Sequence, residues 1–138
     1  MAQNDISQAA VTVLTTGTGT IIVDAGADTS NSSGTYTMAR NAVLSSVNGD
    51  IHVKGDQQVT IGRITTNADV AVISIFGQIV DADADNLITD ITASGLRLNA
   101  ATGIGTDANT IETTVSTVSG RVTGSGLINL LESNGITV

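Results

Sequence analysis

Short runs in which apolar and polar residues alternate recur along the whole chain, and Gly, Asn, Asp or Ser bounds each run. Alternation with a period of two is typical of β-strands, whereas the longer period of an amphipathic helix is almost absent. The pattern therefore predicts an all-β protein with short strands at residues 11–14, 20–23, 42–44, 50–53, 58–61, 69–75, 87–91, 96–98, 121–123, 127–131 and 136–138.

One motif recurs among these strands: a small turn residue, then two apolar residues on either side of a third position. It occurs at residues 48–53, 67–72, 94–98, 126–130 and 134–138. In three successive copies the first apolar residues, Ile51, Val70 and Leu96, are 19 and 26 positions apart. Imperfect periods of this length indicate a β-solenoid in which some coils carry loop insertions.

The composition narrows the kind of core that this solenoid can have. Hydrophobic residues make up 41% of the 138 residues, yet there is one Tyr, one Phe and no Trp. A core of Val, Ile, Leu and Ala without large aromatic side chains should be narrow and uniform, and the missing aromatic landmarks disfavour an immunoglobulin-like sandwich. We predict one domain over residues 1–138, with about five to seven coils.

The two parts of this domain are expected to differ. Residues 48–138 contain the recurring motif, so we expect repeat-like coils there, and irregular or capping coils over residues 1–47. Within the first part, Tyr36, Met38 and the polar run 28–34 are consistent with a loop insertion.

A distinctive block begins with Leu96-Arg97-Leu98 and continues with Ala-Thr-Gly-Ile-Gly-Thr at 101–106, a small polar loop and Ile-Glu-Thr at 111–113. A Gly-rich strand and a final Asn-Gly-Ile-Thr-Val at 134–138 follow, and the turn at 77–84 precedes the block. Over roughly residues 48 to 138 the chain resembles repeats of giant filamentous-haemagglutinin-like exported proteins of bacteria. The resemblance implies a right-handed parallel β-helix and a secreted or cell-surface location. It supplies no catalytic residues.

Charge excludes some classes of partner. Thirteen acidic residues stand against five basic ones, a formal net charge of −8, which repels nucleic acid and anionic membranes. No run approaches the ~20 apolar residues of a membrane helix, and without Cys there is no disulfide framework. The N-terminus is polar and lacks a recognisable signal peptide, so the chain is either cytoplasmic or a segment of a larger exported protein. The resemblance favours the second.

One acidic run is a candidate metal site. Asp81, Asp83 and Asp85 alternate with small residues, and Asp90 is nearby; carboxylates in such an arrangement suit calcium. The EF-hand pattern is not met, because Asn86 stands in the glycine region and Thr92 at the twelfth position. The alternative interpretation is a solvated loop, and no other cofactor is expected.

Catalysis is not expected. His52 lies between Ile51 and Val53, so alternation points it outward, and a dyad with Asp50 would lack a nucleophile. Carbohydrate-active β-helix enzymes need clustered carboxylates together with basic residues, but the basic residues here are spread widely, at Arg40, Lys54, Arg63, Arg97 and Arg121.

The expected function is therefore structural. We expect the chain to be a non-catalytic, stiff rod in a fibre or adhesin that is secreted by bacteria or displayed on their surface. A ligand on a host or another surface is compatible with this role. Its pattern stops within a predicted strand at 136–138, and an unpaired strand edge invites end-to-end self-association. The alternatives are a calcium-dependent binding module that uses the Asp81–Asp85 loop and, more weakly, a carbohydrate-active enzyme.

Overall fold

The computed structural model describes residues 5–10, 13–26, 33–84 and 86–138, and in these residues the chain is all-β and contains no helix. Every pairing between strands of the described residues is parallel. None of the described residues belongs to a helix long and apolar enough to cross a bilayer. The predicted fold class is thus confirmed at the level of an all-β protein with parallel strands.

The strands are short except for two late ones. Their bounds are β1 Ile6–Gln8, β2 Val13–Thr16, β3 Ile21–Ala25, β4 Tyr36–Met38, β5 Val43–Ser46, β6 Ile51–Gly55, β7 Val59–Ile61, β8 Arg63–Thr65, β9 Asp69–Ser74, β10 Gln78–Asp81, β11 Ile91–Ala100, β12 Gly103–Ile104, β13 Ile111–Val122 and β14 Leu130–Glu132.

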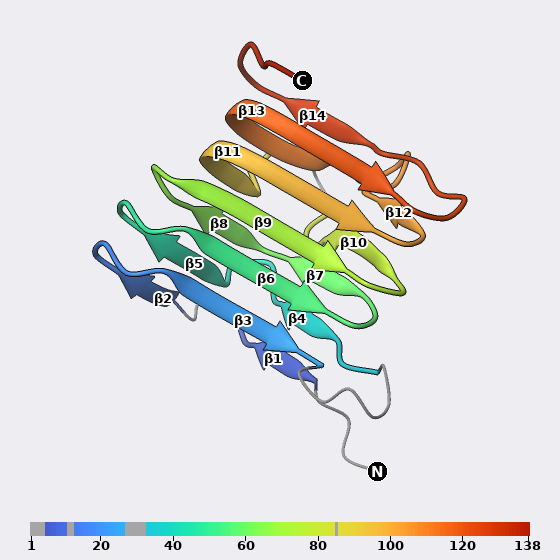
Figure 1. Cartoon of the computed structure of the whole chain (residues 1–138), viewed down its shortest axis with the longest axis horizontal. Coiled ribbons are helices and arrows are strands. Elements are labelled where there is room, and N and C mark those ends of the chain that lie inside the picture. Colours follow the sequence, from blue (N-terminus) through green and yellow to red (C-terminus); the bar gives the residue numbers. More distant parts are fainter. Residues whose placement is uncertain (1–4, 11–12, 27–32, 85) are drawn as a thin grey trace.

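The strands lie in rows, where a row is the set of strands that one turn of the chain contributes. The rows follow one another along the molecule, from β1, β2 and β3 at one end to β13 and β14 at the other (Figure 1). A five-stranded sheet has the order β1-β4-β7-β10-β12. The larger sheet has the order β2-β5-β8-β11-β9-β6-β3, with β13 and then β14 added beside β11. Strands therefore pair with strands of the rows before and after their own, and among the described strands β13 and β14 are the one pair that is also consecutive in sequence.

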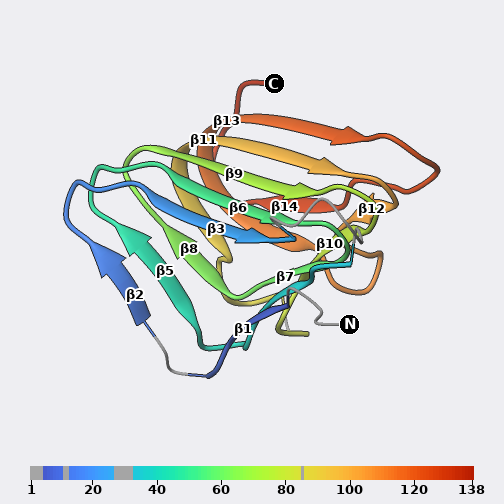
Figure 2. The same ribbon diagram turned by 60° about the horizontal axis from the view of Figure 1, so that its bottom comes forward.

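The long strand β11 joins the two halves of the larger sheet. Its first residues pair with β8, where Ile91 faces Ile64, and its later residues pair with β9, where Leu96 faces Val70. Figure 2 shows the rows from below, with the strands of each row surrounding a common interior. Because β11 continues from the face that contains β8 to the face that contains β9, its hydrogen bonds to the preceding row follow the bend between these faces.

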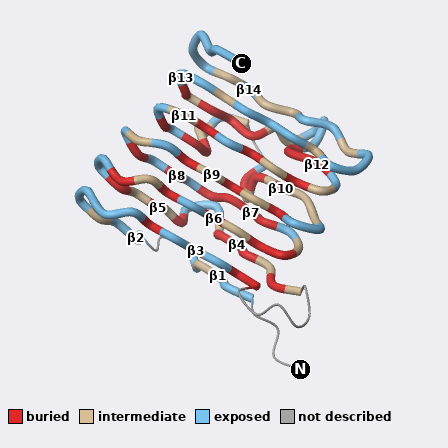
Figure 3. The backbone as a smooth tube through the Cα atoms, viewed as in Figure 1, coloured by how far each residue is buried: buried red, intermediate tan, exposed pale blue. Residues whose placement is uncertain are grey.

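The interior is filled by columns of aliphatic side chains. In one column, parallel register stacks Ile21 on Ile51, Val70, Leu96 and Val118; the first four are buried and Val118 packs against them. Buried and exposed residues alternate along most strands (Figure 3). Burial of aliphatic area at about 25 cal/mol per Å² is the main stabilising contribution of such columns.

Buried hydroxyls occupy several bends between strands. The Ser74 hydroxyl donates to the Gln57 carbonyl oxygen at 2.6 Å and accepts from the Gly77 N–H at 3.1 Å. Ser46 does the same with Gly19 and Gly49, at 3.0 and 2.8 Å. Each hydroxyl thus closes its own turn and binds the row before it, which satisfies polar backbone groups that burial would otherwise leave without partners.

Close approach of neighbouring rows requires glycine at certain bends. A Cβ at Gly126 would overlap the carbonyl oxygen of Thr102, and a Cβ at Gly49 would overlap that of Gly19. Backbone cannot move aside as a flexible side chain can. These positions therefore set how closely successive rows stack.

Most of the predicted strands overlap observed ones, but three predictions are wrong. Residues 136–138 form no strand, and Thr137 makes an isolated bridge to Thr117 instead. Residues 87–90 form no strand, and Leu87 is 84% exposed, because the chain is still in the connection that follows β10. Tyr36 and Met38 are buried in β4, which pairs with β1 and β7, so they are not a loop insertion. Residues 11, 12 and 28–32 lie outside the described residues.

Candidate functional site

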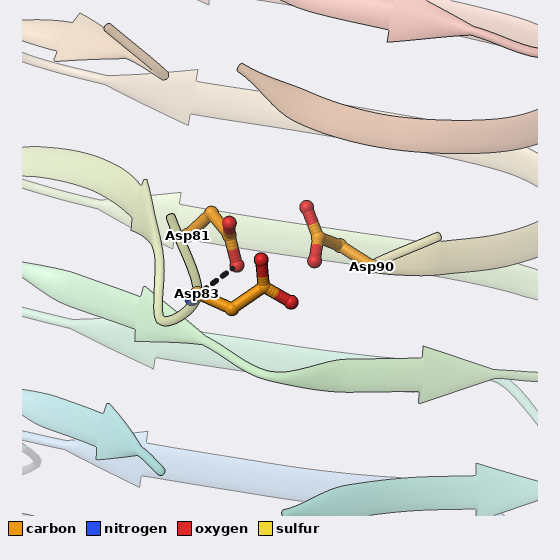
Figure 4. A group of neighbouring side chains, drawn as sticks. All are labelled: Asp81, Asp83 and Asp90. Atoms are coloured by element: carbon orange, nitrogen blue, oxygen red, sulfur yellow. Dashed lines mark hydrogen bonds between the residues drawn. The ribbon is translucent and has the colours of Figure 1, made fainter. Parts of the chain in front are cut away.

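Three buried carboxyl groups meet at the connection between β10 and β11. Asp81 is the last residue of β10, Asp83 follows in the connection, and Asp90 immediately precedes β11. Their exposed fractions are 7%, 5% and 2%. One carboxylate oxygen from each lies within 4.8 Å of the others, and Figure 4 shows the three side chains directed into a common space.

The local backbone brings these side chains together. The Asp83 N–H donates to Asp81 Oδ1 at 3.0 Å, which folds the chain back directly after β10. Asn86 adopts a positive φ of 50°, a conformation that Asn tolerates better than most residues. The connection therefore turns tightly enough for Asp90 to return beside Asp81.

Residues of the following row complete the surroundings. The Asn109 Nδ2 donates to the Asp83 carbonyl oxygen at 2.6 Å, and the Glu112 N–H donates to Asp90 Oδ2 at 2.9 Å. Glu112 is itself buried, and its Oε1 accepts a short hydrogen bond from the Thr110 hydroxyl. A fourth carboxylate thus lies next to the first three.

Several oxygens around this cluster have no hydrogen-bond donor among the described residues. They are Asp81 Oδ2, Asn109 Oδ1 and Glu112 Oε2, all of them buried atoms. A buried oxygen without a donor carries a desolvation penalty of roughly 1–3 kcal/mol, and more when it is charged. No donor of the described residues offsets the burial of these three oxygens.

The basic side chain of Arg40 reaches the edge of the cluster, where its Nε lies 4.0 Å from Asp83 Oδ2. That guanidinium is half exposed, so solvent weakens its field. Burial raises the pKa of Asp90 to about 9; the hydrogen bond from the Glu112 N–H opposes this rise, while the charge of Asp81, a side-chain hydrogen bond with Asp81 and the charge of Glu112 add to it. Burial is also the main cause that raises the pKa of Asp81.

The sequence-based candidates fall partly on this cluster. Asp81 and Asp83 belong to it, and Asp85 lies outside the described residues. Asp90, noted only as a neighbour, is a full member. Glu112 and Asn109 were missed, although Glu112 follows Asp90 by 22 positions, about one row of strands. The signal in the sequence that could have found Glu112 was its acidic side chain, which lies between Ile111 and Thr113 at that interval from Asp90.

His52 lies elsewhere, on the outer face of β6. It is exposed, as alternation predicted, and it borders a shallow hollow with Asp69, Arg97 and Thr117. Asp50 Oδ1 accepts a hydrogen bond from the Asp69 N–H at 3.2 Å. That contact gives Asp50 a structural role in joining β6 to β9.

Comparison of the chain with protein-family models finds no match, and comparisons with curated proteins and with solved structures find none either. The function must therefore be argued from the geometry alone.

Proposed function

We propose that the chain is a non-catalytic structural module, a right-handed parallel β-helix that serves as a stiff rod in a bacterial surface or secreted fibre or adhesin. About five to seven coils would stack at roughly 4.8 Å each. The observation that carries the proposal is the uniformly parallel pairing between rows, because it makes a continuous hydrogen-bond ladder along the length of the molecule.

The row-to-row hydrogen bonds support the solenoid interpretation. Side chains that hydrogen-bond between rows reach partners 17 to 35 positions away in sequence, the interval of one coil with insertions of variable length. Right-handed crossover is the strong preference for parallel strands of one sheet, since strand twist favours it. The aliphatic columns along the interior would resist bending, which suits a rod.

The burial of the carboxyl groups argues against the carbohydrate-active alternative. Glycoside hydrolases separate their two carboxyl groups by about 5–9.5 Å to admit sugar and water. Asp81, Asp83 and Asp90 lie closer together than this and are almost completely buried. A polysaccharide would not reach them.

Self-association would extend the rod. Exposed aliphatic residues occur at both ends of the array of rows, Val13, Leu14 and Ile22 at one end and Leu127, Ile128 and Leu131 at the other. The occupant that fits each end is the opposite end of a second copy, because both offer parallel strand edges together with apolar side chains. A head-to-tail contact of this kind generates an open filament.

Negative-stain electron microscopy at several protein concentrations tests this proposal. We expect unbranched filaments that lengthen with concentration. Leu131→Lys should shorten them, while Phe76→Lys should not, because Phe76 is equally exposed, 51% against 50%, but lies at a bend between the ends. Monodisperse particles at every concentration would rule out self-assembly. Compact particles that are not elongated would rule out the rod itself.

A further inference from the structure

We propose that Asp81, Asp83 and Asp90 bind one divalent cation of the calcium type, and that this ion fastens the connection between β10 and β11 to the row that follows it. This inference does not depend on the role of the chain in a fibre.

The spacing of the oxygens fits one ion. Calcium binds oxygen at about 2.3–2.6 Å, so two of its ligands can be at most about 5 Å apart. The three carboxylate oxygens lie within 4.8 Å of one another. A single ion can therefore contact all three without any large movement of the backbone.

The oxygens without donors point to a missing ligand independently of this spacing. Asp81 is more than nine-tenths buried, its Oδ1 accepts from the Asp83 N–H, and its Oδ2 has no partner among the described residues. Figure 4 shows this side chain directed toward Asp83 and Asp90. Because an ionised oxygen is costly to bury without a counter-charge, a bound cation would offset this cost.

Charge leads to the same conclusion. Asp81, Asp83 and Asp90 would carry three negative charges when ionised, and buried Glu112 adds a fourth nearby. The Arg40 guanidinium reaches Asp83 at the 4.0 Å limit of an ion pair and is half exposed. Two positive charges at the centre of the cluster would balance the carboxylates far better than this peripheral contact does.

The ligand chemistry selects the kind of ion. The cluster offers oxygen only, with no thiolate or imidazole among its members, which favours a hard cation over zinc or copper. Magnesium prefers a strict octahedron and retains several waters. A nearly closed site that already supplies carboxylates and the Asn109 amide oxygen nearby suits calcium better.

The ion would join two rows of the fold. Asp81, Asp83 and Asp90 flank one connection, while Asn109 and Glu112 hold it from the following row through the Asp83 carbonyl and Asp90 Oδ2. With the cation bound, opening this connection would require the loss of several ion–oxygen bonds. The site is thus a structural clamp.

Isothermal titration calorimetry and thermal unfolding of the full chain, first stripped with EDTA, test the proposal. We expect one calcium ion per chain, a weaker response to magnesium, and a rise in Tm of about 10 °C at a hundredfold excess of calcium over Kd. Asp90→Asn should weaken binding at least tenfold. Asp107→Asn, an exposed acidic residue of the following loop, should leave it unchanged.

A second measurement covers the case in which Asp90→Asn does not fold. Amide chemical shifts of the wild-type chain, recorded with and without calcium, should change mainly in residues 80–91 and 109–113. No saturable calcium binding by the wild type, or shift changes confined to other parts of the chain, would overturn the proposal. Equal affinity in a folded Asp90→Asn variant would overturn it too.

Discussion

Asp90 and Glu112 hold each other through two hydrogen bonds across adjacent rows: the Asp90 N–H donates to the Glu112 carbonyl oxygen at 2.9 Å, and the Glu112 N–H donates to Asp90 Oδ2, also at 2.9 Å. The second bond lies outside the regular ladder because a side chain accepts it. It places a buried carboxylate where β13 begins to pair with β11.

The raised pKa of Asp90 makes stability depend on pH when no cation is present. The pKa of about 9 in the folded chain lies above the 3.8 of an aspartate in water, so this group's contribution to stability is fully present below pH ~4 and is lost as pH rises toward about 9. In EDTA we therefore expect Tm to fall across this window. Thermal unfolding followed by circular dichroism measures the slope.

The Asp90→Asn variant is the control for this pH dependence. It keeps the shape of the side chain but cannot ionise, so much of the slope between pH 5 and 9 should disappear in EDTA. Saturating calcium should flatten the slope in the wild type. A wild-type Tm that stays constant over this range in EDTA would contradict the prediction.

The hydroxyl of Ser74 should contribute measurably to stability. Ser74→Ala removes the bonds to Gln57 and Gly77 and leaves buried backbone groups without partners, at a cost of about 1–3 kcal/mol in the free energy of unfolding. Ser125→Ala, at an exposed position, should change it by less than about 0.5 kcal/mol. Urea denaturation of both variants checks this, and equal effects would argue against the bridging role.

The aliphatic columns predict large effects of truncation in the interior. Leu98 stacks between Val72 and Gly120 and is fully buried. Leu98→Ala should lower the free energy of unfolding by about 2–5 kcal/mol. The same truncation at exposed Leu87 should have almost no effect, and a comparable loss at both positions would be inconsistent with the observed core.

Row spacing predicts different outcomes for two glycines. Gly126→Ala forces a methyl group against the Thr102 carbonyl, whereas an added Cβ at Gly135 meets no atom within 4 Å. We expect Gly126→Ala to destabilise the protein by about 1–3 kcal/mol, while Gly135→Ala should be nearly neutral. Chemical denaturation compares the two directly. A neutral Gly126→Ala would mean that the rows can separate at this bend.

Local sequence was enough to predict the strands that alternate clearly. The runs around Ile51, Val70 and Leu96 carry apolar residues at every second position and small residues at their ends, so they form strands wherever a core exists to cover them. The short strands β1, β4, β8, β10 and β12 escaped prediction, since two to four residues give too little alternation. Only pairing with neighbouring rows makes them strands.

For the cluster, the amino-acid sequence was enough to show that carboxylates at 81 and 83 are separated by one small residue, and that the strands enclose an aliphatic interior. The folded chain was needed to show that Asp90 returns beside them and that Glu112 and Asn109 approach from the next row. The cause of this difference is strand register. Alternation sets which face a side chain occupies, but the length of each connection sets which side chains of successive rows meet, and no local pattern encodes that length.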